Sequence, residues 1–274
     1  MTIRETAFLG RPLDVPIIDA HTHIGPKYRR GWHQKPEYTT FASQVAMYDR
    51  LGVNCCVTAP HQLCDAMTVL TNRTAAEAAA EFPGRIYGYI YIAPFEGMDV
   101  CRQNIETYSK NPAFVGVKFL GGYQGQYSEP VYQYAADFAN EAHCPLLCHT
   151  FDGQPAVETV AALAEHRPGL SLLIAHQGGG SRELTERAAP FVRDMPNVRM
   201  ELCGSLFNTM SFADIADLVG VDNLIFGTDA IDLDARFDFG RVAFSTLSDE
   251  DKRKIFAGNY LQLLEHSQLG KIVL

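Results

Sequence analysis

Residues 17–23 read IIDAHTH, an apolar run that ends in two histidines separated by one residue. Side chains two positions apart on a strand point to the same face. His21 and His23 are therefore expected to share a face and to be able to hold one ion, and Asp19 is expected on that side, one step deeper. The alternative is a pair of histidines in a surface loop.

Along the rest of the chain, short β-rich runs like this one alternate with longer helical patterns. The strand candidates are residues 16–21, 53–58, 86–92, 114–119, 145–150, 171–176, 197–203 and 223–228. Helical patterns lie at 44–51, 73–82, 100–110, 130–142, 156–165, 183–192 and 212–219. Each interval between strands has room for a crossover helix, and this alternation predicts a parallel sheet.

Eight such strands, with no glycine-rich dinucleotide fingerprint, favour a closed (β/α)8 TIM barrel over an open sheet. The length of 274 residues suits one barrel, so we expect a single domain over residues 1–274. The barrel core is expected at about 16–230. The tail at about 249–268 is expected to form two short helices broken at Gly258.

Barrel enzymes carry their chemistry at the carboxyl ends of strands, and reactive residues collect at those positions here. His149 follows PLLC, His176 ends SLLIAH, and Asp229 follows LIFGT. Any one of these alone is more simply a structural polar residue. Together with His21 and His23 they make a reasonable site for Zn²⁺ or a similar first-row ion.

The motif set resembles the amidohydrolase superfamily, and within it the amidohydrolase-related branch typified by aminocarboxymuconate semialdehyde decarboxylase. The resemblance covers about residues 16–265. The motifs that carry it are DAHTH, the strand-end His149, AHQGG around His176, FGTD before residue 230 and the closing segment IFAGNYLQLL.

The resemblance implies a role for each of these residues and one divalent metal ion, most simply Zn²⁺, with Mn²⁺, Fe²⁺, Ni²⁺ and Co²⁺ as alternatives. His21, His23 and His149 would be ligands. Asp229 would be a ligand or would carry the proton of the metal-bound water, and His176 would orient that water or polarise the substrate.

The chain departs from the branch at the fourth strand, where VGVKFLGG stands in place of the usual IKLHP run. Lys118 is kept and the following His-Pro is absent. We favour one metal with Lys118 contacting an anionic substrate group, over a carboxylated lysine that bridges two metals or a lysine of no special function.

Two reactions fit these residues. A metal-activated water attacking a small, carboxylate-bearing molecule would make the protein a hydrolase, which is our first expectation. The alternative is decarboxylation of an aromatic or unsaturated acid. A TatD-like nuclease and a non-catalytic metal-binding protein are less favoured.

Two further groups are candidate substrate contacts. The loop after the first histidines, IGPKYRRGWH, carries Arg29 and Arg30, which would suit a carboxylate; the alternative is a solvated surface loop. On the seventh strand Glu201 and Cys203 share a face and are expected to line the pocket.

Composition limits the partners. The net charge of −9 is unfavourable for nucleic-acid binding, and no apolar run is long enough to span a membrane. Seven cysteines without a C-x-x-C pair and a first segment without a long apolar region predict reduced thiols and a cytoplasmic location. We expect a small anionic substrate and, by resemblance, a possible homodimer.

Overall fold

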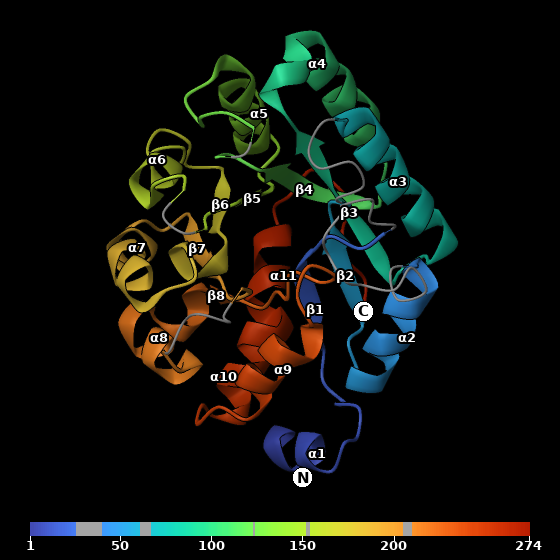
Figure 1. Ribbon diagram of the computed structural model, residues 1–274, viewed down its shortest axis with the longest axis vertical. Helices are drawn as coiled ribbons and strands as arrows, with labels where there is room; N and C mark the ends of the chain where they lie inside the picture. Colours follow the sequence, from blue (N-terminus) through green and yellow to red (C-terminus); the bar gives the residue numbers. More distant parts are fainter. Residues whose placement is uncertain (26–39, 61–66, 123, 152–153, 205–209) are drawn as a thin grey trace.

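Eight parallel strands form a barrel surrounded by helices (Figure 1). The structure is a computed structural model that describes residues 1–25, 40–60, 67–122, 124–151, 154–204 and 210–274. The strands are β1 Ile18–Thr22, β2 Cys55–Thr58, β3 Ile86–Ile92, β4 Phe114–Phe119, β5 Pro145–Cys148, β6 Ser171–Ile174, β7 Val198–Glu201 and β8 Leu224–Ile225. They pair in chain order from β1 to β8, so the predicted TIM barrel is confirmed.

The barrel closes between its first and last strands. The Ala20 amide donates to the Phe226 carbonyl at 3.0 Å, and the Asp229 amide donates to the His21 carbonyl at 2.8 Å. Backbone pairing therefore continues past the short β8, and it brings the ends of β1 and β8 side by side. His21 and Asp229 become neighbours although they lie far apart in the chain.

Helices cover the outside of the barrel and its end. They are α1 Ile3–Phe8, α2 Phe41–Leu51, α3 Thr68–Glu81, α4 Gly97–Tyr108, α5 Pro130–Glu141, α6 Val157–Ala161, α7 Arg182–Asp194, α8 Phe212–Val219, α9 Ala235–Ala243, α10 Asp249–Arg253 and α11 Asn259–Leu264. In the part of the chain with described coordinates, no helix combines the length and apolar character needed to cross a membrane.

The helical pattern between successive strands was predicted correctly, and α1 and α9 were missed. The expected break at Gly258 is wrong. A π-helical turn, Lys254–Gly258, joins α10 to α11 without interrupting the helical path, because Gly258 itself has helical dihedral angles.

The core has two layers. One lies between the strands and the surrounding helices. The other contains Ile18 of β1, Leu147 of β5 and Ile225 of β8 in one contact cluster. Because β1 and β5 lie on opposite sides of the barrel, this second cluster fills its interior, as packed side chains do in such barrels.

Strand β1 carries an irregularity that decides which side chains face inward. Its register with β2 shifts between Asp19 and Thr22. The Asp19 carboxylate accepts a hydrogen bond from Tyr48 of the outer helix α2 at 2.8 Å, whereas His21 contacts residues inside the barrel. The expectation that Asp19 shares the face of His21 is therefore wrong, because an irregular strand loses strict alternation.

Candidate metal centre

Three potential metal ligands converge at the joined ends of β1 and β8. Nε2 of His23 lies 3.2 Å from Nε2 of His21 and 3.1 Å from Oδ1 of Asp229. The third side of this triangle, from His21 Nε2 to Asp229 Oδ1, measures 3.7 Å. We call these three residues the front set. Donors bound at about 2.0–2.2 Å to one ion stand roughly 3.3 Å apart, so this triangle fits a first-row metal ion.

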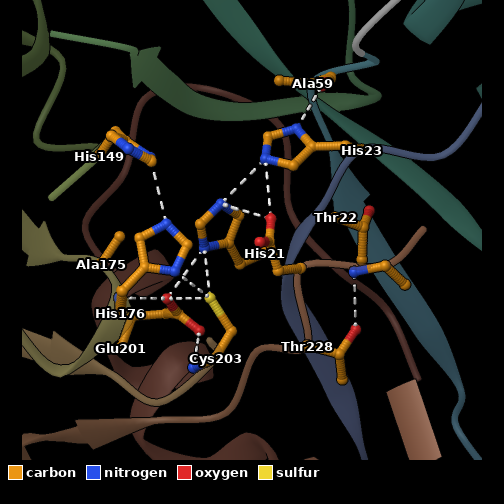
Figure 2. A network of polar contacts seen from close by, with 12 residues as sticks. His21, Thr22, His23, Ala59, His149, Ala175, His176, Glu201, Cys203 and Thr228 are labelled. Atoms are coloured by element: carbon orange, nitrogen blue, oxygen red, sulfur yellow. Dashed lines mark hydrogen bonds and ion pairs between the residues drawn. The ribbon is translucent and has the colours of Figure 1, made fainter. Parts of the chain in front are cut away.

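Hydrogen bonds fix the tautomer of both histidines. Nδ1 of His23 donates to the Ala59 carbonyl at 2.7 Å, which leaves a lone pair on its Nε2. Nδ1 of His21 lies 2.9 Å from Oε2 of Glu201, and Figure 2 shows Glu201 on the opposite side of the His21 ring from His23. Each imidazole therefore presents an unprotonated nitrogen to the same place.

Burial keeps the His21 ring uncharged. It lowers the pKa of His21 well below its ordinary value, and the nearby Lys118 adds to the effect. Burial also raises the pKa of Glu201 to about 7, against the hydrogen bonds from Cys203 that lower it. A neutral imidazole is the form that binds a metal, so the front set is ready for a cation.

A buried network outside the barrel holds the two strand ends together. The Asp19 carboxylate accepts hydrogen bonds from the Thr228 amide at 3.0 Å and from the hydroxyls of Thr228 and Tyr48 at 2.5 and 2.8 Å. The next residue, Asp229, has a left-handed φ of 59°. An aspartate tolerates this conformation better than most residues, and the turn aims its carboxylate at the histidines.

A glycine makes room for the carboxylate behind His21. A Cβ at Gly227 would lie 2.1 Å from Oε1 of Glu201 and 2.8 Å from Cβ of His21. Such contacts are far shorter than van der Waals separations, so the glycine of the FGTD motif allows Glu201 to reach His21.

Lys118 brings a fully buried amine to this centre. Its Nζ lies 2.8 Å from Nε2 of His21. Burial lowers the pKa of Lys118, while the negative charges of Asp229 and Glu201 oppose that shift. The amine at the end of β4 therefore faces the same space as the front set.

His149 and His176 form a second pair beside the front set. Nε2 of His176 lies 3.1 Å from Nδ1 of His149 (Figure 2). Burial lowers the pKa of His149 to about 3 and the pKa of His176 well below its ordinary value, so both rings are neutral. His149 is not among the three donors that stand within 4.8 Å of one another at the front set, although it lines the same end of the barrel.

Of the remaining candidates from the sequence, Glu201 lies within the described residues and the two arginines do not. Glu201 is fully buried behind His21 and contacts Cys203. Arg29 and Arg30 lie outside the described residues. Tyr48 and Thr228 also support the site, but no sequence motif points to Tyr48, because its role depends on where α2 packs.

Comparison with known proteins identifies the family to which the chain belongs. A family model described as Amidohydrolase matches residues 18–264, so the chain belongs to the amidohydrolase family and is an enzyme of that type. No curated protein sequence matches the chain.

Several solved structures share the fold. 2,6-Dihydroxybenzoate decarboxylase from Rhizobium has 15% identity and a TM-score of 0.72, with 92% of this chain and 99% of that chain covered. 5-Carboxyvanillate decarboxylase from Sphingomonas paucimobilis has 12% identity and a TM-score of 0.73, covering 93% and 100%. A dihydroxybenzoic acid decarboxylase from Polaromonas sp. JS666, solved with manganese and 2-nitroresorcinol, has 16% identity and a TM-score of 0.72, covering 92% and 97%.

Proposed function

We propose that the protein is a metal-dependent decarboxylase of a small aromatic or unsaturated acid. The observation that carries this proposal is the front set beside a buried lysine: Nζ of Lys118 lies 2.8 Å from Nε2 of His21. A metal ion bound by the front set and the ammonium group of Lys118 would then face one space. Two positive charges there suit a substrate with an acid group. The solved structures named above, which are decarboxylases of aromatic acids, support decarboxylation over the hydrolysis that the sequence alone favoured.

His21, His23 and Asp229 would hold the metal, with His149 as a further ligand from the neighbouring strand end. When bound, the divalent ion supplies positive charge that holds oxygen atoms of the acid and stabilises the negative charge left as carbon dioxide departs. Two imidazoles and a carboxylate suit Mn²⁺, Fe²⁺ or Zn²⁺.

The chain's own residues supply binding and proton transfer. Lys118 binds an anionic oxygen of the acid, because an ammonium in a water-poor site attracts a carboxylate or phenolate strongly. His176 positions His149, whose Nδ1 lies 3.1 Å from Nε2 of His176, and so acts on the substrate indirectly. These contacts fix the acid before its carbon–carbon bond breaks.

Asp229 carries the proton that the reaction consumes. Its side chain is 14% exposed, so it can take up a proton from solvent and deliver it to the carbon that loses the carboxylate. The bond between the ring carbon and the carboxylate breaks, carbon dioxide leaves, and a carbon–hydrogen bond replaces it. Proton delivery by a positioned carboxylic acid is general acid catalysis.

The test is product analysis with metal-loaded protein. Dihydroxybenzoates and carboxyvanillate-type acids should release carbon dioxide, and in D2O the product should carry one deuterium at the decarboxylated carbon. Asp229→Asn should lose this activity. Hydrolysis of lactones or amides with no carbon dioxide released from any acid would contradict the proposal.

Arg29 and Arg30 are proposed as additional contacts for an anionic group. Replacing both by methionine should raise KM for the acid while kcat changes little, since the reacting carbon is held by other residues. An unchanged KM would remove them from the substrate site.

The proposal also covers the identity of the metal, the cellular location and the oligomeric state. Manganese is favoured because relatives of this fold were solved with it, and zinc remains the other candidate. A reducing cytoplasmic location is supported by the six described cysteines, all of which are free thiols. A homodimer is proposed and is tested by light scattering.

A further inference from the structure

Four buried potential ligands gather at Nδ1 of His21, the ring nitrogen that faces away from the front set, with that nitrogen counted as one of them. They are His21 itself, His176, Glu201 and Cys203, and we call them the thiol cluster. None is more than 2% exposed. One ligand atom from each residue lies within 4.8 Å of the others, and Figure 2 shows the Cys203 sulfur between the His21 ring, the His176 ring and the Glu201 carboxylate.

The separations between these atoms are close to those around a tetrahedral ion. Sγ of Cys203 lies 3.1 Å from Nδ1 of His21, 3.2 Å from Nδ1 of His176 and 2.9 Å from Oε2 of Glu201. Metal bonds of about 2.3 Å to sulfur and about 2.0–2.1 Å to nitrogen or oxygen place tetrahedral ligands about 3.3–3.6 Å apart. The three separations from sulfur would have to lengthen by about 0.3–0.7 Å to admit an ion.

We propose that the thiol cluster is a second metal site, which binds Zn²⁺ or a similar thiolate-preferring ion and shares His21 with the front set. His21 then bridges the two ions, with Nε2 in the front set and Nδ1 in the thiol cluster. Binding releases the Cys203 thiol proton and the Nδ1 proton of His21 to solvent. A thiolate, imidazole nitrogen and a carboxylate together favour zinc over hard cations such as magnesium.

Charge and backbone both support this site. The carboxylate of Glu201 and the thiolate of Cys203 neutralise a divalent ion, which a buried position requires. The Cys203 amide donates to Oε1 of Glu201 at 2.6 Å, so the carboxylate is already aimed. A Cβ at Gly204, whose φ is 76°, would lie 2.6 Å from Nδ1 of His176, so the glycine lets the ring approach the sulfur.

The second site goes beyond the proposed decarboxylation, which uses only the metal of the front set. Apart from His21, its donors are the last residue of β7, Cys203 two residues further on, and His176 in the turn after β6. The clearest sign of occupation is a bond between metal and sulfur, because the front set contains no sulfur. Metal stoichiometry and sulfur ligation therefore test this site separately from catalysis.

The experiment is a Co²⁺ titration of metal-depleted protein, followed by equilibrium dialysis and ultraviolet absorption. The wild-type chain should bind two equivalents, one of which produces a thiolate-to-cobalt charge-transfer band. Cys203→Ala should bind one equivalent and lose the band. The matched control is Cys101→Ala, which removes another buried thiol, on α4, and should keep both equivalents and the band.

Zinc-loaded wild-type protein provides a second measurement that needs no variant. X-ray absorption should show sulfur at about 2.3 Å from part of the zinc. A single bound equivalent, a second equivalent without sulfur ligation, or a charge-transfer band that persists in Cys203→Ala would overturn the second site.

Failure of the two proposals can be told apart. Carbon dioxide release by protein with one equivalent of metal and no sulfur ligation would refute the thiol cluster and leave decarboxylation intact. Two equivalents with sulfur ligation and no carbon dioxide release from any acid would refute the proposed reaction alone.

Discussion

Replacing Lys118 by methionine should have opposite effects on metal affinity and on substrate affinity. Nζ of Lys118 lies 2.8 Å from Nε2 of His21. A metal–nitrogen bond is about 2.0–2.1 Å long, so an ion on that nitrogen and the ammonium cannot be further apart than about 4.9 Å unless the lysine moves.

The repulsion at that separation can be bounded. A divalent ion and a single positive charge repel by about 2 kcal/mol with the dielectric constant of water, and by about 7 kcal/mol with an effective value of 20. The lysine can lose its proton or swing aside, which reduces the measured effect. We therefore expect Lys118→Met to tighten metal binding by about 10- to 100-fold, or about 1.4–2.8 kcal/mol.

The loss of the same charge should weaken binding of the acid, so KM should rise as metal affinity rises. The assay is competition with a chromogenic chelator for metal affinity, together with steady-state kinetics at saturating metal. A control is Lys110→Met, because Lys110 is exposed and pairs with Glu106 on the surface. Weaker metal binding in Lys118→Met would refute the argument and would favour a carboxylated lysine that bridges two metals.

Three further outcomes are expected. Tyr48→Phe removes one hydrogen bond to the buried Asp19 carboxylate and should lower the free energy of unfolding by about 1–3 kcal/mol; urea denaturation with an unchanged midpoint would contradict this. His23→Ala should lose more metal than His149→Ala, because only His23 lies within the front set; elemental analysis showing the reverse would make His149 the stronger ligand. Burial raises the pKa of Cys144 to about 12, so this thiol is almost fully protonated at pH 8. It should therefore resist alkylation until the protein unfolds. Rapid modification of Cys144 in native protein, detected by mass-spectrometric mapping, would contradict this.

Much of the fold could be predicted from sequence because strand and helix periods are local. Each observed strand lies within or beside a predicted run, and reactive residues do end the strands. The closing of β1 against β8 follows from the number of strands, so the meeting of His21 with Asp229 could be expected. These inferences needed only the order of residues and the geometry of a barrel.

Other features depend on contacts that no local pattern records. The register shift in β1 turns Asp19 toward Tyr48 instead of the barrel interior. Glu201 reaches His21 across 180 positions of sequence and supports that ring from behind, a role that its position on a strand does not reveal. The separation of His149 from the front set likewise depends on how far each strand end extends around the barrel.

The left-handed φ of 59° at Asp229 limits how this site can be changed by evolution or by design. Aspartate, asparagine and histidine adopt that backbone conformation more readily than most residues, as His176 does here with a φ of 54°, whereas glutamate there would oppose the turn that aims the carboxylate. The eighth strand can therefore offer a short carboxylate, an amide or an imidazole, and few other donors. A search for variants that prefer another metal should leave position 229 unchanged and vary the strand ends that carry Lys118 and His149, whose backbones impose no such restriction.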